Sequence, residues 1–89
     1  MEGKNKHIVI LGAGESGVGA AVLAKKYEWN VFVSDAGKIK ADYKTELDNN
    51  QIEWEENTHS TDRIFQAELI VKSPGIPETT DLMRALRNK

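Results

Sequence analysis

Residues 8–17, which read Ile-Val-Ile-Leu-Gly-Ala-Gly-Glu-Ser-Gly, decide the fold of this chain. Four consecutive aliphatic residues predict a strand that is covered on both faces, as in a parallel sheet. Glycines follow at positions 12, 14 and 17, and a run of small residues from Ser16 to about Glu28 predicts a helix. A strand, G-x-G-x-x-G and a helix in this order are typical of a turn that binds a diphosphate. The glycines would permit the tight turn, the approach of the ligand and close packing of the helix on the strand.

Length and composition limit the class of protein. The chain has 89 residues, so we expect residues 1–89 to form one small domain. Its net charge of −2 gives no electrostatic footprint for nucleic acid or for an anionic membrane, and neither is expected as a partner. The absence of cysteine excludes disulfides, thiolate metal sites and cysteine nucleophiles. There is no apolar run of membrane-spanning length, and residues 1–6 lack the apolar core of a signal peptide, so a cytoplasmic location is expected.

Three further segments predict strands. Val31–Ser34 and Leu69–Val71 read as buried strands, whereas Ile52–Glu55 alternates apolar and polar residues and reads as a half-exposed edge strand. Leu69–Val71 has the composition of a central strand, yet no fifth strand follows it within the 89 residues. Because an uncovered apolar edge favours aggregation, we expect that this chain is a fragment whose fifth strand lies beyond Lys89. The fragment is expected to self-associate through that edge.

Helices are expected between these strands. In the first helix, an apolar stripe is expected from Val18, Val22, Leu23 and Tyr27, and close packing on the sheet is expected from the small residues Gly19, Ala20, Ala21 and Ala24. Other helices are predicted over residues 38–50, over residues 60–65 and from Thr79 or Thr80 onwards. Right-handed crossovers between parallel strands place such helices on the faces of the sheet. The pattern therefore predicts a three-layer αβα domain with the strand order 3-2-1-4.

Polar residues that could carry chemistry are few. Asp35 follows the second strand about 18 residues after the glycines, close to the position that holds a ribose hydroxyl in dinucleotide-binding folds. A turn-capping aspartate is the alternative. Ser16 is expected to cap the first helix or to contact a phosphate. Val18-Gly19 stands where a P-loop requires Lys-Ser/Thr, so no ATP-hydrolysing site is expected here.

The acidic residues near the edge strand are expected to form a solvated face and not a metal site. They are Glu53, Glu55 and Glu56. A metal ion needs ligands that converge on one point, and nothing nearby in the sequence supplies them. His59 follows in a polar stretch and is expected at the surface.

Three segments together resemble the N-terminal domain of the Mur ligase family, in particular its D-glutamate-adding type. They are Val9–Gly17, Val33–Asp35 and Leu69–Pro77, and Ser73-Pro74-Gly75-Ile76-Pro77 is the most specific part. The resemblance covers nearly the whole chain. It implies a Rossmann-like domain that binds UDP-N-acetylmuramoyl-L-alanine and not NAD.

The resemblance also implies a longer parent enzyme. That enzyme would have three domains, would be monomeric and would add D-glutamate to the peptidoglycan precursor at the expense of ATP. ATP and magnesium would bind in its central domain, outside these 89 residues. No cofactor, metal ligand or catalytic residue is therefore expected in this chain, which should be inactive alone.

The resemblance assigns ten residues to substrate binding. Those matching the diphosphate loop are Gly14, Glu15, Ser16 and Gly17; those matching the uracil and ribose segment are Asp35, Ala36 and Gly37; those matching the facing loop are Ser73, Pro74 and Gly75. Some family members carry a hydroxyl residue and an arginine directly after the aspartate, where this chain has Ala36-Gly37. Lys38 or Lys40 could supply the missing positive charge.

Glu15 is an unusual residue beside a phosphate. Two like charges about 4 Å apart repel by roughly 4 kcal/mol at an effective dielectric of about 20. An amide hydrogen bond to a charged group returns only about 1.5–3 kcal/mol. We therefore expect the Glu15 side chain to point away, so that only backbone donors hold the diphosphate.

Two other classes of protein could carry parts of the same sequence pattern. An NAD-binding dehydrogenase or regulatory module would carry the same glycines and acid, but it has no need for Ser73–Pro77. A domain that keeps the fold only as an interaction scaffold would bind no nucleotide. A sibling Mur ligase that adds a different amino acid is a further alternative.

Overall fold

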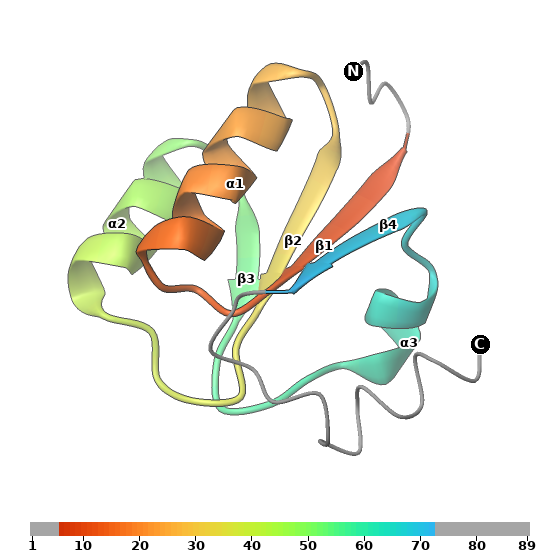
Figure 1. Cartoon of the computed structure of the whole chain (residues 1–89). Helices are drawn as coiled ribbons and strands as arrows, with labels where there is room; N and C mark the ends of the chain where they lie inside the picture. Colours follow the sequence, from red (N-terminus) through yellow and green to blue (C-terminus); the bar gives the residue numbers. More distant parts are fainter. Residues whose placement is uncertain (1–5, 73–89) are drawn as a thin grey trace.

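Strands and helices alternate along residues 6–72, the part of the chain that this computed structural model describes (Figure 1). The elements are β1 (His7–Leu11), α1 (Glu15–Lys26), β2 (Asn30–Ser34), α2 (Ala41–Asn49), β3 (Glu53–Glu55), α3 (Thr61–Phe65) and β4 (Leu69–Lys72). The strands form one parallel sheet in the order β3-β2-β1-β4. The predicted α/β class and the order 3-2-1-4 are confirmed.

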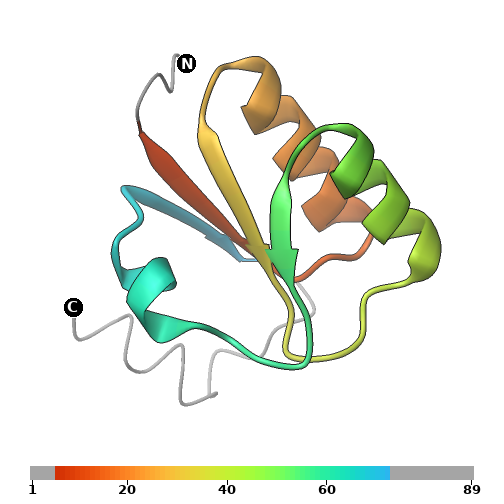
Figure 2. The ribbon, with the colours of Figure 1, turned by 180° about the vertical axis from the view of Figure 1, so that it is seen from behind.

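The helices lie on both faces of the sheet and give it three layers. Figures 1 and 2 show α1 and α2 on one face and α3 on the other. Successive residues of β1 therefore enter different cores: Ile8 and Ile10 pack with the α1 side, whereas Val9 and Leu11 pack with Ile64 of α3. Because β1 also has a strand on either side, all four of its aliphatic residues are at most 3% exposed. This explains why they form a continuous apolar run.

Helix α1 packs on the sheet mainly through small residues, as expected for Ala21 and Ala24, whereas part of its predicted apolar stripe is exposed. Its buried residues are Gly17, Val18, Ala21 and Ala24. Leu23 and Tyr27 are 52% and 44% exposed, so their placement on the buried stripe was wrong. Small side chains at positions 17, 21 and 24 share one face of the helix and let its axis approach the strands closely.

The two edge strands of the described sheet differ in how far their side chains are exposed. Strand β3 has three residues, and Ile52 just before it is buried while Trp54 is half-buried, as expected of an edge strand. Strand β4 forms the other described edge, and its Leu69 is 40% exposed. The loop at 73–77, the helix expected after Thr79 and any later strand lie outside the described residues.

None of the helices within residues 6–72 has the length and apolar character needed to cross a membrane.

Candidate functional site

The glycine turn between β1 and α1 is tightly fixed by backbone contacts. Gly12 has a φ of 100°, a conformation that side chains disfavour, and its N–H donates to the Ser34 carbonyl oxygen at 2.8 Å. At Gly17, a Cβ atom would lie 1.9 Å from the Gly12 carbonyl oxygen. Glycine is therefore required at position 12 by backbone conformation and at position 17 by the close contact of α1 with the turn.

The N-terminus of α1 opens toward space beside this turn. Gly14 is the N-cap residue, and a Cβ atom built on it meets no atom within 4 Å. The first hydrogen bond of the helix runs from the Val18 N–H to the Gly14 carbonyl oxygen at 2.9 Å. The amides of the first turn have no partner within a helix of this geometry and point to where an anion can bind.

The side chains of this first turn take no part in capping. Ser16 lies inside α1 and is exposed, and α1 has no side-chain cap, so the capping expectation for Ser16 was wrong. Because Gly14 already occupies the N-cap position, Ser16 comes two residues too late to accept from the N2 or N3 amide as a cap does. Glu15 is also exposed, at the first position of the helix.

Asp35 joins the glycine turn to the loop after β2. Its Oδ2 accepts from the Ala13 N–H and its Oδ1 accepts from the Gly37 N–H, both at 2.8 Å. The alternative role of Asp35 as a turn cap is thus confirmed. Each carboxylate oxygen keeps a second lone-pair direction, so a direct contact with a ribose stays a compatible prediction.

Some of the predicted site residues belong to the part of the chain that the structure describes, and others do not. The turn at Gly14–Gly17 and the loop at Asp35–Gly37 lie at the carboxyl ends of β1 and β2, where open α/β sheets bind ligands. Ala36, Gly37, Lys38 and Lys40 are exposed. The residues predicted to face this pair of loops, Ser73, Pro74 and Gly75, lie outside the described residues.

Two of the three acidic residues near β3 are structural hydrogen-bond acceptors, which corrects the expectation of a solvated face. Glu55 Oε2 accepts from Ser34 Oγ at 2.7 Å and from the Ser60 N–H at 2.6 Å, and Oε1 accepts from Ser60 Oγ at 2.6 Å. Burial raises the pKa of Glu55, but these hydrogen bonds, with the nearby His59, hold it below its ordinary value. Only Glu53, in an exposed ion pair with Arg63, matches the expectation.

Glu56 ties the loop after β2 to α2. It accepts from the Lys44 ammonium at 2.9 Å and from the Ile39 N–H at 3.0 Å. The Lys44 hydrogen bond, followed by that from Ile39, holds the pKa of Glu56 below its ordinary value. Among residues 6–72, no three histidine or acidic side chains gather as they would around a metal ion.

His59 is half-buried and not at the surface as expected, because it contacts a buried hydroxyl. Its Nδ1 lies 2.5 Å from Ser34 Oγ. Ser34 is 0% exposed at the end of a strand that is otherwise buried and apolar. A buried hydroxyl needs polar partners, so the serine in the Val31–Ser34 run was the sequence signal that such partners exist.

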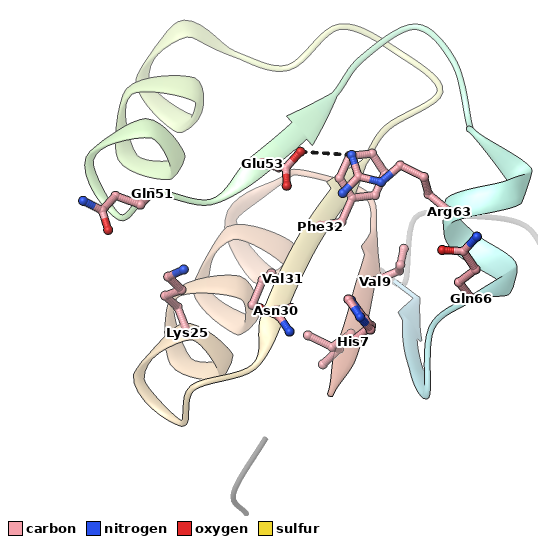
Figure 3. Close-up of a pocket in the computed structure, with 11 residues that line it drawn as sticks. His7, Val9, Lys25, Asn30, Val31, Phe32, Gln51, Glu53, Arg63 and Gln66 are labelled. Atoms are coloured by element: carbon pink, nitrogen blue, oxygen red, sulfur yellow. Dashed lines mark hydrogen bonds and ion pairs between the residues drawn. The ribbon is translucent and has the colours of Figure 1, made fainter. Parts of the chain in front are cut away.

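A pocket of about 230 Å³ lies away from the glycine turn and from the Asp35–Gly37 loop. It sits over the amino-terminal halves of β1, β2 and β3, and Figure 3 shows His7, Asn30 and Gln66 around it. Its rim includes Arg63, which lies 3.8 Å above the ring of Phe32 and pairs with Glu53 at 3.1 Å. The pocket contains none of the predicted site residues, so we place the candidate site at the carboxyl-end loops.

Comparison with known proteins identifies the family of this chain. Residues 7–82 match the family model described as MurD N-terminal domain. Proteins named UDP-N-acetylmuramoylalanine–D-glutamate ligase are 51% identical in Christiangramia forsetii, 54% in Bacteroides fragilis and 48% in Cytophaga hutchinsonii. The matches cover 94%, 94% and 96% of this chain but 19% of each of these relatives, so the chain spans about a fifth of their length. The chain belongs to the MurD N-terminal domain family.

Proposed function

We propose that this chain is the substrate-binding domain of a UDP-N-acetylmuramoylalanine–D-glutamate ligase and that it binds UDP-N-acetylmuramoyl-L-alanine. The observation that carries the proposal is the Asp35 carboxylate, which bonds to Ala13 and Gly37 and so joins the two loops expected to hold the nucleotide. Family membership and the relatives' names support the same substrate.

In this proposal the amides that open α1 hold the diphosphate. Gly14 leaves room for the phosphates, and the first turn of α1 supplies N–H donors together with the positive end of the helix dipole. Glu15 contributes only its backbone, because its carboxylate would repel a phosphate. The uridine part binds at Asp35–Gly37, and Ser73–Gly75 remain the predicted opposite wall.

The chemistry of amide-bond formation belongs to the longer parent protein. We propose that this parent is a cytoplasmic, ATP-dependent enzyme of peptidoglycan synthesis. ATP and magnesium do not fit the described residues. Val18-Gly19 replaces the Lys-Ser/Thr of a P-loop, and residues 6–72 offer no metal-binding cluster. The chain alone is therefore expected to bind substrate without turnover.

A nitrogen-15 NMR titration tests this function. The labelled chain is titrated with UDP-N-acetylmuramoyl-L-alanine and, separately, with NAD. We expect shifts at Gly14–Gly17, Asp35 and Ser73–Gly75 with the UDP-sugar, and none of comparable size with NAD. Shifts at the same glycines with NAD alone would refute the proposal in favour of a dinucleotide-binding module.

The Glu15 side chain provides a matched test of the backbone-only arrangement. Glu15→Ala should bind the UDP-sugar as well as the unsubstituted chain or better, since a repulsive charge is removed. Loss of binding in this variant would show that the carboxylate takes part.

A further inference from the structure

The buried hydroxyl of Ser34 lies at the centre of a partly buried polar network. We call Ser34, Glu55, His59 and Ser60 the Ser34 network. Ser34 Oγ lies 2.7 Å from Glu55 Oε2, 2.5 Å from His59 Nδ1 and 3.2 Å from the Thr58 carbonyl oxygen. Ser60 donates both its N–H and its hydroxyl to the same Glu55 carboxylate. The network therefore fastens the loop between β3 and α3 to the last residue of β2.

The chemistry of these groups fixes the direction of the hydrogen bonds. The Glu55 carboxylate and the Thr58 carbonyl oxygen both only accept, and the single proton of the Ser34 hydroxyl goes to Glu55 because the carboxylate oxygen is charged and lies closer, at 2.7 Å against 3.2 Å. The lowered pKa of Glu55 supports the ionised form. Ser34 Oγ then has only lone pairs left for His59, which must donate through Nδ1–H. The geometry thus assigns one tautomer to His59, with Nδ1 protonated.

The same loop also holds the backbone around Asp35. The Asp35 N–H donates to the Glu55 carbonyl oxygen at 3.1 Å, and the Thr58 N–H donates to the Asp35 carbonyl oxygen at 3.3 Å. The Asn57 N–H donates to the Gly37 carbonyl oxygen at 2.9 Å. Figures 1 and 2 show the loops after β2 and β3 side by side at the carboxyl end of the sheet. Two sets of contacts thus hold the Asp35–Gly37 loop. The Asp35 side chain accepts from the Ala13 N–H, and backbone hydrogen bonds join this loop to the β3–α3 loop.

We propose that the Ser34 network positions the Asp35–Gly37 loop for the uridine part of the ligand, with His59 and Glu55 as positioning residues that do not touch the ligand. This inference rests on the proposed function. It gives the β3–α3 loop a role in nucleotide binding. His59 controls that role because its hydrogen bond secures the far end of this loop, close to Thr58 and Asn57.

Binding measurements on two ligands separate positioning from general stability. UDP contains the uridine part, whereas inorganic pyrophosphate probes only the N-terminus of α1. Loss of one hydrogen bond should weaken UDP binding by about three- to tenfold in His59→Ala. Pyrophosphate binding should change by less than about twofold. His59→Asn, whose side-chain amide can donate from the position of Nδ1, should restore most of the UDP affinity.

The other histidine of the chain provides the matched control. His7 is exposed at the amino end of β1, far from the network, and His7→Ala should bind UDP as the unsubstituted chain does. Unchanged UDP affinity in His59→Ala would overturn the inference. So would an equal loss of UDP and pyrophosphate binding, because that would indicate a general loss of stability.

Spectra of the ligand-free chain keep this test independent of the proposed function. Imidazole nitrogen-15 spectra should show His59 protonated at Nδ1, and His59→Ala should shift the amides of Asp35 and Gly37 while His7→Ala should not. If the unsubstituted chain binds no UDP, the proposed function fails. The chemical shifts of the Asp35 and Gly37 amides in His59→Ala still show whether His59 positions this loop. Unshifted Asp35 and Gly37 amides in His59→Ala would refute the positioning role.

Discussion

Replacing Gly17 with alanine tests the close contact between α1 and the glycine turn. The added Cβ would lie 1.9 Å from the Gly12 carbonyl oxygen, 3.0 Å from its carbon and 3.4 Å from Ile10 Cγ2. The carbonyl cannot move aside cheaply. Gly12 is held at a φ of 100°, and its N–H is bonded to the Ser34 carbonyl oxygen. The helix and the turn must therefore separate.

The expected cost follows from two opposing effects. Overpacking a well-packed site costs about 1–3 kcal/mol, and a backbone clash at this distance belongs at the upper end, about 3 kcal/mol. Alanine is favoured over glycine inside a helix by about 1 kcal/mol. The net loss in the free energy of unfolding is therefore about 2 kcal/mol, which lowers Tm by roughly 8–16 °C for a domain of this size.

Gly19→Ala is the matched control in the same helix. Gly19 is exposed, and a Cβ atom built on it meets nothing within 4 Å. Only the helix preference remains, so this variant should gain about 0.5–1 kcal/mol. Urea and thermal unfolding followed by circular dichroism should thus move in opposite directions for the two variants. A Gly17→Ala chain as stable as the unsubstituted one, with an unchanged urea m value, would refute the reasoning.

Three further outcomes are expected. Gly14→Ala should change the free energy of unfolding by less than about 1 kcal/mol, because the added Cβ meets open space; isothermal titration should nevertheless show weaker UDP binding, since the methyl group enters the space proposed for the diphosphate. Burial raises the pKa of Glu55 but its hydrogen bonds lower it more, so its contribution to stability is present above the ordinary glutamate pKa and is lost as the pH falls through the lowered value. Urea midpoints measured between about pH 6 and pH 3 should therefore decline less in Glu55→Gln than in the unsubstituted chain, and an equal decline would exclude this role. Arg63→Ala should lower the free energy of unfolding by about 1 kcal/mol, measured by thermal unfolding, because the Arg63 guanidinium covers the Phe32 ring. Glu53→Ala removes only an exposed ion pair and should lower it by less than about 0.5 kcal/mol. Equal losses in the two variants would contradict a role for the stacking.

The sequence predicted the sheet and its order because the signals for them are local. The apolar run before Gly12 identified β1 as a central strand, and the alternation in Ile52–Glu55 identified an edge. Handedness rules for crossovers then left one arrangement of the strands. The same local reading located Asp35 beside the glycine turn, where it bonds to the Ala13 amide.

The sequence did not predict which polar side chains would be used inside the molecule. Glu55 and His59 looked like surface residues, yet both bond to Ser34, which precedes them by 21 and 25 residues along the chain. Ser16 looked like a helix cap, but the turn placed Gly14 at that position. Such roles depend on which distant segment packs against a residue, and the neighbouring residues in the sequence do not identify that segment.

The sequence by itself determined the α/β class, the strand order and the position of the glycine turn, since each follows from residue spacing within one or two elements. Only the tertiary structure decided that Leu23 and Tyr27 of α1 are exposed and do not face the sheet. It also decided that the β3–α3 loop supports Asp35. The physical reason is that burial and hydrogen-bond satisfaction are properties of the assembled layers: a side chain becomes buried, or a hydroxyl finds its partners, only when strands far apart in sequence lie next to each other.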